Sequence, residues 1–254
     1  MLKRVTDIMV SAIALLVLLP ALVAIATAIL VCNGRPLFYR GVRIGRFGKP
    51  FRIFKFRTMV ADAEWLGGSA TADTDVRITR IGRILRKHKL DELAQLINVL
   101  LGEMSLVGPR PEVPEYVGLL RGEAQLILTV RPGITDWAAL WDADEGALLA
   151  QTSDPERMYV DYIRPEKVKL QLQYVQARSL WTDLCILWKT AYAIAFKPTP
   201  PAFTQLSNDN LATLQGACTA AVTASASSDR GSPRTQERQN GPQRKQGVVP
   251  PSQP

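Results

Sequence analysis

Two adjacent acids, Asp91 and Glu92, lie in a cation-rich part of the sequence. Arg110 follows them between two prolines, and the basic residues just upstream are Arg83, Arg86, Lys87 and Lys89. Carboxylates among fixed cations suit phosphoryl chemistry, because one carboxylate can attack phosphorus or hold Mg²⁺ while Arg and Lys spread the charge of the transferred group. The structural alternative is that acids in the first turn of a helix simply complement its dipole.

Histidine and cysteine are too scarce for most other catalytic chemistry. The 254 residues contain one histidine (His88) and three cysteines, with a formal net charge of +8. These counts exclude a disulfide framework, an all-cysteine zinc site and a histidine-rich metal centre. An enzyme built from this sequence is therefore expected to use carboxylates, Lys, Arg and a hard cation.

Two basic stretches precede the acid pair. Residues 33–57 carry eight basic residues and no acid, and the GRFGKP turn at 45–50 predicts a β-hairpin. Further on, Arg77, Arg80, Arg83 and Arg86 recur every third residue between isoleucines, which predicts an amphipathic helix at a membrane interface. Solvated strand and helix faces are the alternatives for both stretches.

An uncharged segment of 25 residues runs from Ile8 to Cys32. Its length suits a helix that enters a membrane, whereas a buried core helix or a cleaved signal peptide fits poorly. Pro20 near its centre predicts a kink, and both flanks are basic, with Lys3 and Arg4 before it and several arginines after it. A straight span would satisfy only one flank, but a re-entrant helix satisfies both.

The remaining chain divides by composition. Leu90 and the apolar residues after it predict a helix opened by Asp91 and Glu92, and residues 154–198 also read as helices. The apolar run 180–196 holds two tryptophans and suits either an interfacial helix or a core helix. From about residue 200 the composition predicts disorder. The expected domains are a membrane helix hairpin at 1–34, a catalytic domain at 35–200 and a disordered tail at 201–254.

Four blocks of sequence resemble the bacterial sugar transferases, more narrowly the monotopic polyprenol-phosphate phosphoglycosyl transferases. The blocks are KRVTDIMVSAIALLVLLP (3–20), RIFKFRTM (52–59), LDELAQLINVLLGEMSLVGPRPE (90–112) and VRPGITDWAAL (130–140). They occur in order over residues 2–198, and together they are highly specific. The resemblance implies an α+β, mainly helical fold with a Pro-kinked re-entrant helix, a short β-hairpin, interfacial helices and a small catalytic domain.

The resemblance also implies roles for individual residues. Asp91 matches the nucleophile that attacks the β-phosphate of a UDP-sugar, and Glu92 matches its partner; with Asp91 it is the expected Mg²⁺ site. The positions expected to contact phosphate or polyprenol phosphate are Lys55, Arg57, Arg86, Arg110 and Arg131. The products are UMP and polyprenol-diphosphate-sugar, formed at the start of surface polysaccharide or glycoconjugate assembly.

The expected surroundings follow from the same resemblance. The protein would lie in the bacterial inner membrane with its catalytic domain on the cytoplasmic face, against anionic headgroups. A homodimer and downstream glycosyltransferases are the further partners considered, and nucleic acid is not expected. The alternative is a non-catalytic, membrane-anchored basic module that binds anionic lipid or nucleic acid; such a module has no use for acids among its cations, because acids weaken phosphate binding.

This sequence departs from the family pattern at three places. Leu19 precedes Pro20 where the family often has serine, and Glu103 stands where aspartate is more usual. Asp136 follows the GIT block where glycine is more usual. Because that block lies where nucleotide-sugar contacts are expected, the third departure puts any inference about the sugar in doubt.

Overall fold

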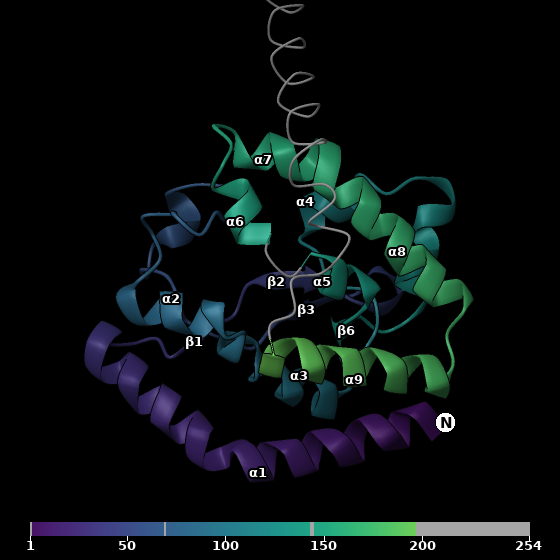
Figure 1. Cartoon of the computed structure of the whole chain (residues 1–254), viewed down its shortest axis with the longest axis horizontal. Coiled ribbons are helices and arrows are strands. Elements are labelled where there is room, and N and C mark those ends of the chain that lie inside the picture. The colour runs from purple at the N-terminus through teal and green to yellow at the C-terminus, as the bar shows by residue number, and fades with distance from the viewer. Residues whose placement is uncertain (1, 69, 143–144, 197–254) are drawn as a thin grey trace, which may run out of the picture. The chain divides into compact units, whose positions relative to one another are not determined.

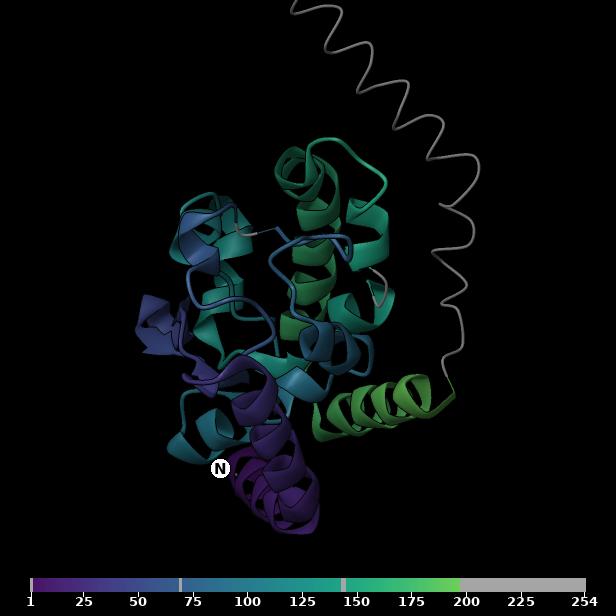
Figure 2. The ribbon, with the colours of Figure 1, turned by 90° about the vertical axis from the view of Figure 1, so that its left-hand side faces the viewer.

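The structure is a computed structural model that describes residues 2–68, 70–142 and 145–196. It is mostly helical with a few short strands, which agrees with the α+β expectation. The predicted disordered tail at 201–254 lies outside the described residues. Figures 1 and 2 show α1 along the lower side, α9 near it, and α6, α7 and α8 toward the opposite side.

The N-terminal helix α1 (Leu2–Asn33) is continuous and contains Pro20. Among the described residues it is the one helix long and apolar enough to cross a membrane, and most of its apolar stretch is exposed. Figure 1 shows the ribbon of α1 changing direction along its length. The helix packs against α3 (Gln95–Leu101) and the strand β5 (Ser105–Val107).

The predicted β-hairpin is confirmed. Strands β2 (Val42–Ile44) and β3 (Pro50–Arg52) pair antiparallel, and a one-turn 3₁₀ helix (Arg46–Gly48) lies in the connection between them. The short strands β1 (Phe38–Tyr39) and β4 (Lys55–Phe56) pair beyond them, with Tyr39 opposite Lys55. The basic stretch therefore folds back on itself through two antiparallel pairings, and Lys55 lies at the start of β4.

The predicted cationic stripe from Arg77 to Arg86 is wrong at its first residue, because helix α2 (Arg80–Lys87) begins only at Arg80. Thr79 caps its start by accepting a hydrogen bond from the Gly82 amide, so Arg77 lies outside the helix. Arg77 is buried, and its Nη2 lies 2.7 Å from Asp75 Oδ2. The period of three therefore does not form one helical face, because the cap places Arg77 in the preceding loop.

The acid pair lies in a short turn that precedes the helix, whereas the sequence predicted that the two acids open the helix itself. A 3₁₀ turn (Leu90–Glu92) holds Asp91 and Glu92, and α3 follows at Gln95. Lys89 adopts a left-handed conformation with φ of 54°, which is uncommon for a residue with a side chain. This residue turns the chain sharply between α2 and the acids.

Strand β5 pairs in parallel with β6 (Gly133–Thr135). The two backbones approach so closely that a Cβ on Gly133 would lie 2.1 Å from the Gly108 amide nitrogen. Glycine is therefore needed at this crossing for a steric reason. The crossing sets the position of the segment that follows β5 and carries Arg110.

The second half of the described chain is a set of helices. They include the short helices α4 (Pro114–Val117), α5 (Trp137–Trp141), α6 (Glu145–Leu149) and α7 (Pro155–Met158), with a 3₁₀ turn at Gly122–Thr129 and a π-helical turn at Tyr159–Ile163. A further 3₁₀ turn (Ala63–Trp65) lies earlier in the chain, before α2. Longer helices follow, α8 (Arg164–Gln176) and α9 (Leu180–Phe196). The main core joins Leu96, Leu106, Tyr174 and Ile186, with α1 packed against it.

Helix α9 has the predicted bounds and is not a core helix along most of its length. Asp183 and Ile186 are buried, but Trp181 and Trp188 are 74% and 75% exposed. Its Tyr192 and Phe196 rings are also exposed and lie in contact with each other. The exposed side of α9 is therefore aromatic.

Candidate active site

Asp91 and Glu92 meet two of the predicted cations. Asp91 is 2% exposed, and its Oδ2 lies 3.0 Å from Lys55 Nζ. Lys55 Nζ is also 3.3 Å from Glu92 Oε1, so one ammonium bridges both carboxylates. Arg110 donates to Glu92 with both terminal nitrogens, at 2.6 and 3.3 Å. The structure thus brings four of the sequence-predicted residues together.

The electrostatics favour an ionised Glu92. Burial by itself raises the pKa of this carboxyl, but the charges of Arg110 and Lys55 outweigh it and hold the pKa well below its usual range. The charge of Glu92 raises the pKa of Arg110 in turn. The Arg110 side chain remains 39% exposed and that of Lys55 22% exposed, so both cations can be reached by an anionic ligand.

Arg86 lies close enough to Asp91 for the two charges to interact. Its Nε donates to Thr58 Oγ1 at 2.9 Å, which fixes the guanidinium between α2 and the segment after β4. Burial lowers its pKa, and the negative charge of Asp91 partly offsets this. Arg86 therefore adds positive potential near Asp91 without a direct ion pair to it in the described residues.

Two of the residues predicted to contact phosphate, Arg57 and Arg131, donate hydrogen bonds to backbone carbonyls. Arg57 is buried and donates to the carbonyls of Asn33, Gly34 and Arg35, where α1 ends. Arg131 Nε donates to the Gly102 carbonyl at 2.8 Å, beyond the end of α3. Both arginines thus satisfy carbonyls that a helix end leaves without partners.

A buried residue that the sequence reasoning missed positions the strand of Lys55. Asn98 is fully buried, accepts a hydrogen bond from the Phe54 amide at 2.8 Å and donates to the Arg52 carbonyl at 3.0 Å. It also donates to Glu103 at 2.6 Å. An asparagine among leucines and valines on α3 was the signal available, since a polar residue on an apolar helix face needs partners.

Asp136 positions Arg110. Its side chain is fully buried, accepts from the Ala139 amide at the start of α5 and accepts from the Arg110 amide at 3.2 Å. Burial raises its pKa, although these hydrogen bonds and the charge of Arg110 work in the opposite direction. The departure from the family pattern at this position thus creates a link between β6, α5 and the segment of Arg110.

A second cluster of acids lies near the first. Lys167 on α8 pairs with Asp142 at 2.5 Å and with Glu145, and its side chain is only 4% exposed. Burial raises the pKa of Asp142 well above its usual range. Burial also raises the pKa of Glu145, but the charge of Lys167 lowers it to about 2. None of these three residues was singled out from the sequence, because the ion pairs join positions far apart in the chain.

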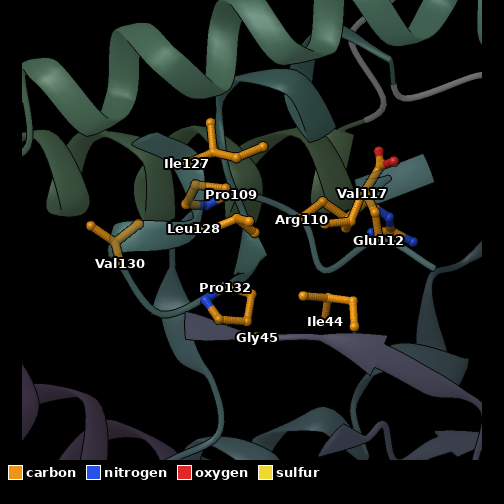
Figure 3. A pocket seen from close by; sticks show the side chains of 10 residues that line it. All are labelled: Ile44, Gly45, Pro109, Arg110, Glu112, Val117, Ile127, Leu128, Val130 and Pro132. Carbon is orange, nitrogen blue, oxygen red and sulfur yellow. The ribbon is translucent and has the colours of Figure 1, made fainter. Parts of the chain in front are cut away.

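The cavity beside Arg110 is too small for a substrate. It has a volume of about 20 Å³ and is lined mainly by apolar side chains, among them Ile44, Ile127 and Pro132. Figure 3 shows it between the segment of Pro109 and Arg110 and the strand that holds Ile44. This space suits a single water molecule.

The donor set limits how a metal ion would bind. Within residues 2–68, 70–142 and 145–196, no group of three or more His, Cys, Asp or Glu side chains is placed to hold a metal ion. Asp91 and Glu92 are two adjacent carboxylates, 2% and 13% exposed. This set fits Mg²⁺ where substrate phosphates and water supply the other ligands, because Mg²⁺ commonly keeps waters and uses one or two carboxylates.

Comparison with known proteins gives the same family throughout. The sequence model described as bacterial sugar transferase matches residues 1–197. An Aeromonas hydrophila UDP-N-acetylgalactosamine-undecaprenyl-phosphate N-acetylgalactosaminephosphotransferase is 35% identical over 76% of this chain and 43% of its own length. A Komagataeibacter xylinus undecaprenyl-phosphate glucose phosphotransferase is 40% identical over 74% of this chain and 35% of its own.

A third relative is similar in length. The exopolysaccharide production protein ExoY of Rhizobium meliloti (strain 1021) is 35% identical over 76% of this chain and 85% of its own length. The chain therefore spans less than half of the first two relatives and most of the third. With the matched segment covering the membrane helix, the hairpin and the acid pair, this chain belongs to the bacterial sugar transferase family.

Proposed function

We propose that the protein transfers a sugar 1-phosphate from a UDP-sugar to polyprenol phosphate through a covalent intermediate on Asp91. The geometry that carries the proposal is a buried carboxylate held against Lys55, beside a Glu92–Arg110 pair whose guanidinium is accessible. The names of the relatives describe transfer of this kind for those proteins. Sequence, site and relatives thus support one reaction class.

In the first step, an Asp91 carboxylate oxygen attacks the β-phosphorus of the UDP-sugar. A bond forms between Asp91 and phosphorus, and the bond from that phosphorus to the bridging oxygen breaks. The bridging oxygen leaves with UMP, and the sugar phosphate stays on Asp91 as an acyl phosphate. Lys55 and Arg110 stabilise the equatorial oxygens, where charge accumulates in such transfers.

In the second step, a phosphate oxygen of polyprenol phosphate attacks the same phosphorus. The new bond forms the diphosphate of polyprenol-diphosphate-sugar, and the bond to Asp91 breaks, which restores the carboxylate. Each step uses a nucleophile that is already ionised at neutral pH, so no histidine is needed as a base.

Asp91 and Glu92 are the residues that would hold Mg²⁺ together with the diphosphate of the donor. When bound, Mg²⁺ would neutralise the diphosphate and the leaving UMP. Arg110 and Lys55 hold the pKa of Glu92 below its usual range in the absence of substrate, and both cations are partly exposed and available for phosphate.

The membrane arrangement follows from the two ends of α1. At its start, Lys3 Nζ lies 2.6 Å from Asp183 Oδ2, and Arg4 donates to the Val99 carbonyl at 2.7 Å. At its end, Arg57 binds three carbonyls and Asn33 donates to Thr79 at 3.0 Å. Both ends are thus held by the same folded unit.

A helix tied at both ends to one folded unit would place both ends on the same side of a membrane. This supports a re-entrant α1 that bends at Pro20, because a spanning helix would carry one end away to the other side. The exposed Trp181 and Trp188 on α9 support an interfacial position for that helix. These features support our proposal that the site lies at the membrane surface, on the cytoplasmic face of the bacterial inner membrane.

The reaction is tested by measuring UMP release from a panel of UDP-sugars with membrane fractions that contain polyprenol phosphate. Asp91→Asn should lower turnover by at least about a thousandfold, because a neutral amide is a poor nucleophile. Asp161→Asn, an exposed aspartate in an ion pair with Arg157, is the matched control and should retain activity. Near-normal turnover of Asp91→Asn would show that the nucleophile is misassigned.

The topology is tested with a chain in which Cys32, Cys185 and Cys218 are replaced by serine. Single cysteines are then introduced at positions 2 and 36 and probed with an impermeant thiol reagent in sealed vesicles of known orientation. A re-entrant helix predicts that both positions react from the same side. Reaction from opposite sides would establish a spanning helix.

A further inference from the structure

An apolar pocket lies between α1 and the turn that carries the acid pair. Its volume is about 150 Å³. All its lining side chains are apolar: Leu15, Leu22, Val23 and Ala26 on α1, Phe38 and Phe56 on the paired strands β1 and β4, and Ala94 and Ile97 at the start of α3. A pocket of this size with no polar group to hold water suits an apolar guest, since comparable engineered cavities stay dry and bind benzene.

Two backbone relationships connect the pocket with the proposed active site. Phe56 lines the pocket and directly follows Lys55 on β4. Ala94 follows Asp91 by three residues, in a stretch whose first turn is 3₁₀, where residues three apart share a face. Lys55 and Asp91, which form an ion pair, therefore lie one and three residues along the chain from residues that line the pocket.

The pocket also faces the membrane side of the site. Half of its lining residues come from α1, the helix long and apolar enough to enter a membrane. Val23 at its edge is 56% exposed, so an apolar chain could enter from the surroundings of α1. Lys55, the chain neighbour of Phe56 in the lining, pairs with Asp91 at the proposed phosphate site.

We infer that this pocket holds the isoprene unit nearest the phosphate of the polyprenol phosphate acceptor. The inference rests on the proposed function, which requires that phosphate at Asp91 and therefore places its first isoprene carbons within a few bonds of the acid pair. A branched five-carbon unit suits an apolar pocket of about 150 Å³ better than a long straight chain does. The pocket would orient the acceptor phosphate for attack and favour isoprenoid over straight-chain phosphates.

Ala26 offers a way to fill the pocket with a matched control on the same helix. Ala26→Leu places a larger side chain in the pocket, whereas Ala24→Leu makes the same change at an exposed position that does not line it. The purified full-length variants are compared in detergent, with neryl phosphate and n-decyl phosphate as acceptors. Both acceptors have ten carbons, so they differ in branching and unsaturation rather than in chain size.

The two half-reactions are measured separately. Exchange of labelled UMP into UDP-sugar reports the first step without acceptor, and product formation reports the second. Ala26→Leu should leave exchange near that of the unaltered protein and raise the KM for neryl phosphate about tenfold, the effect of withdrawing about two methylene groups from an apolar site. Its preference for neryl over decyl phosphate should fall, and Ala24→Leu should change neither quantity.

A second pair keeps the test valid if Ala26→Leu fails to fold. Val23→Phe narrows the exposed mouth of the pocket, and Val17→Phe makes the same change at an exposed position outside it. Normal exchange with an unchanged acceptor KM in the folded pocket variants would overturn the isoprene assignment and leave the proposed function intact. A variant that loses lipid-dependent thermal stability while its acceptor KM stays unchanged would assign the pocket to a bilayer acyl chain. Absence of UMP exchange in the unaltered protein would instead reject the proposed covalent reaction.

Discussion

Two clusters in this protein combine a pair of carboxylates with a cation, and they differ in access. Asp91 and Glu92 meet Lys55 and Arg110, whose side chains are 22% and 39% exposed. Asp142 and Glu145 meet Lys167, which is 4% exposed. The cations of the first cluster are open to a phosphate, whereas in the second cluster Lys167 and Asp142 are enclosed and only Glu145, at 29%, is partly exposed. Solvent access, rather than residue type, separates a binding site from a structural ion pair.

Removal of the enclosed cation, Lys167, tests the difference between the two clusters most directly. Lys167→Met should lower the free energy of unfolding by about 3–5 kcal/mol, because it leaves the buried Asp142 carboxyl and the partly buried Glu145 carboxyl without their positive partner. Thermal unfolding of the purified protein in detergent measures the change. Lys169→Met removes an exposed lysine paired with Glu166 and should change stability by less than about 1 kcal/mol. Equal effects of the two changes would contradict a structural role for the enclosed cluster.

Removing the accessible cation should affect activity more than stability. Lys55→Met is expected to lower the rate of UMP release by about a hundredfold, the usual size for loss of one charged group that stabilises a transition state. Single-turnover kinetics with UDP-sugar give the rate, and the unfolding temperature shows whether the fold is retained. A folded Lys55→Met protein with an unchanged rate would remove Lys55 from the proposed mechanism.

The pH dependence tests the Glu92–Arg110 pair. Burial raises the pKa of Glu92, and the charges of Arg110 and Lys55 lower it below its usual value. Ionised Glu92 therefore stabilises the fold above the unfolded pKa of 4.5, and that stabilisation is lost as the pH falls through the lower folded pKa. Arg110→Gln removes the larger of the two charge effects, so the acid limb of kcat/KM should move about one pH unit higher.

The control for this profile is Arg121→Gln, which removes an exposed arginine that binds only nearby carbonyls among the described residues. Its acid limb should coincide with that of the unaltered protein. An acid limb that stays in place for Arg110→Gln would show that Glu92 ionisation does not limit the reaction.

The smallest expected effect concerns Asp136. Asp136→Gly removes the cap of α5 and the acceptor for the Arg110 amide, and should cost about 1 kcal/mol of stability and lower kcat a few-fold. Asp136→Asn keeps an oxygen acceptor and should stay close to the unaltered protein. The split between kcat and the KM for UDP-sugar distinguishes misplacement of Arg110 from loss of binding. A glycine variant with unchanged kcat would contradict the positioning role.

Local patterns predicted the elements whose formation depends on neighbours in the chain. The hairpin turn at residues 45–50 and the bounds of the 180–196 helix were readable, because turn residues and apolar periodicity act within a few residues. The Arg77 stripe was mispredicted, since the period of three gave no indication that Thr79 would cap the helix. The hydrogen bonds of Arg57 and Arg131 to backbone carbonyls were not predicted either. In sequence, a basic residue that binds phosphate looks the same as one that binds the end of a helix.

The sequence by itself determined the chemistry that is available: paired acids, many cations, one histidine, and a membrane-length apolar helix with a central proline. Only the tertiary structure decided which cations meet the acids and which bind helix ends, because those partners are 18 to 37 residues apart for Glu92 and 22 to 24 for Arg57. The same holds for the two ends of α1 and for the apolar pocket between α1, the paired strands and the start of α3. Distances between residues far apart in the chain depend on packing, and packing is a property of the whole fold.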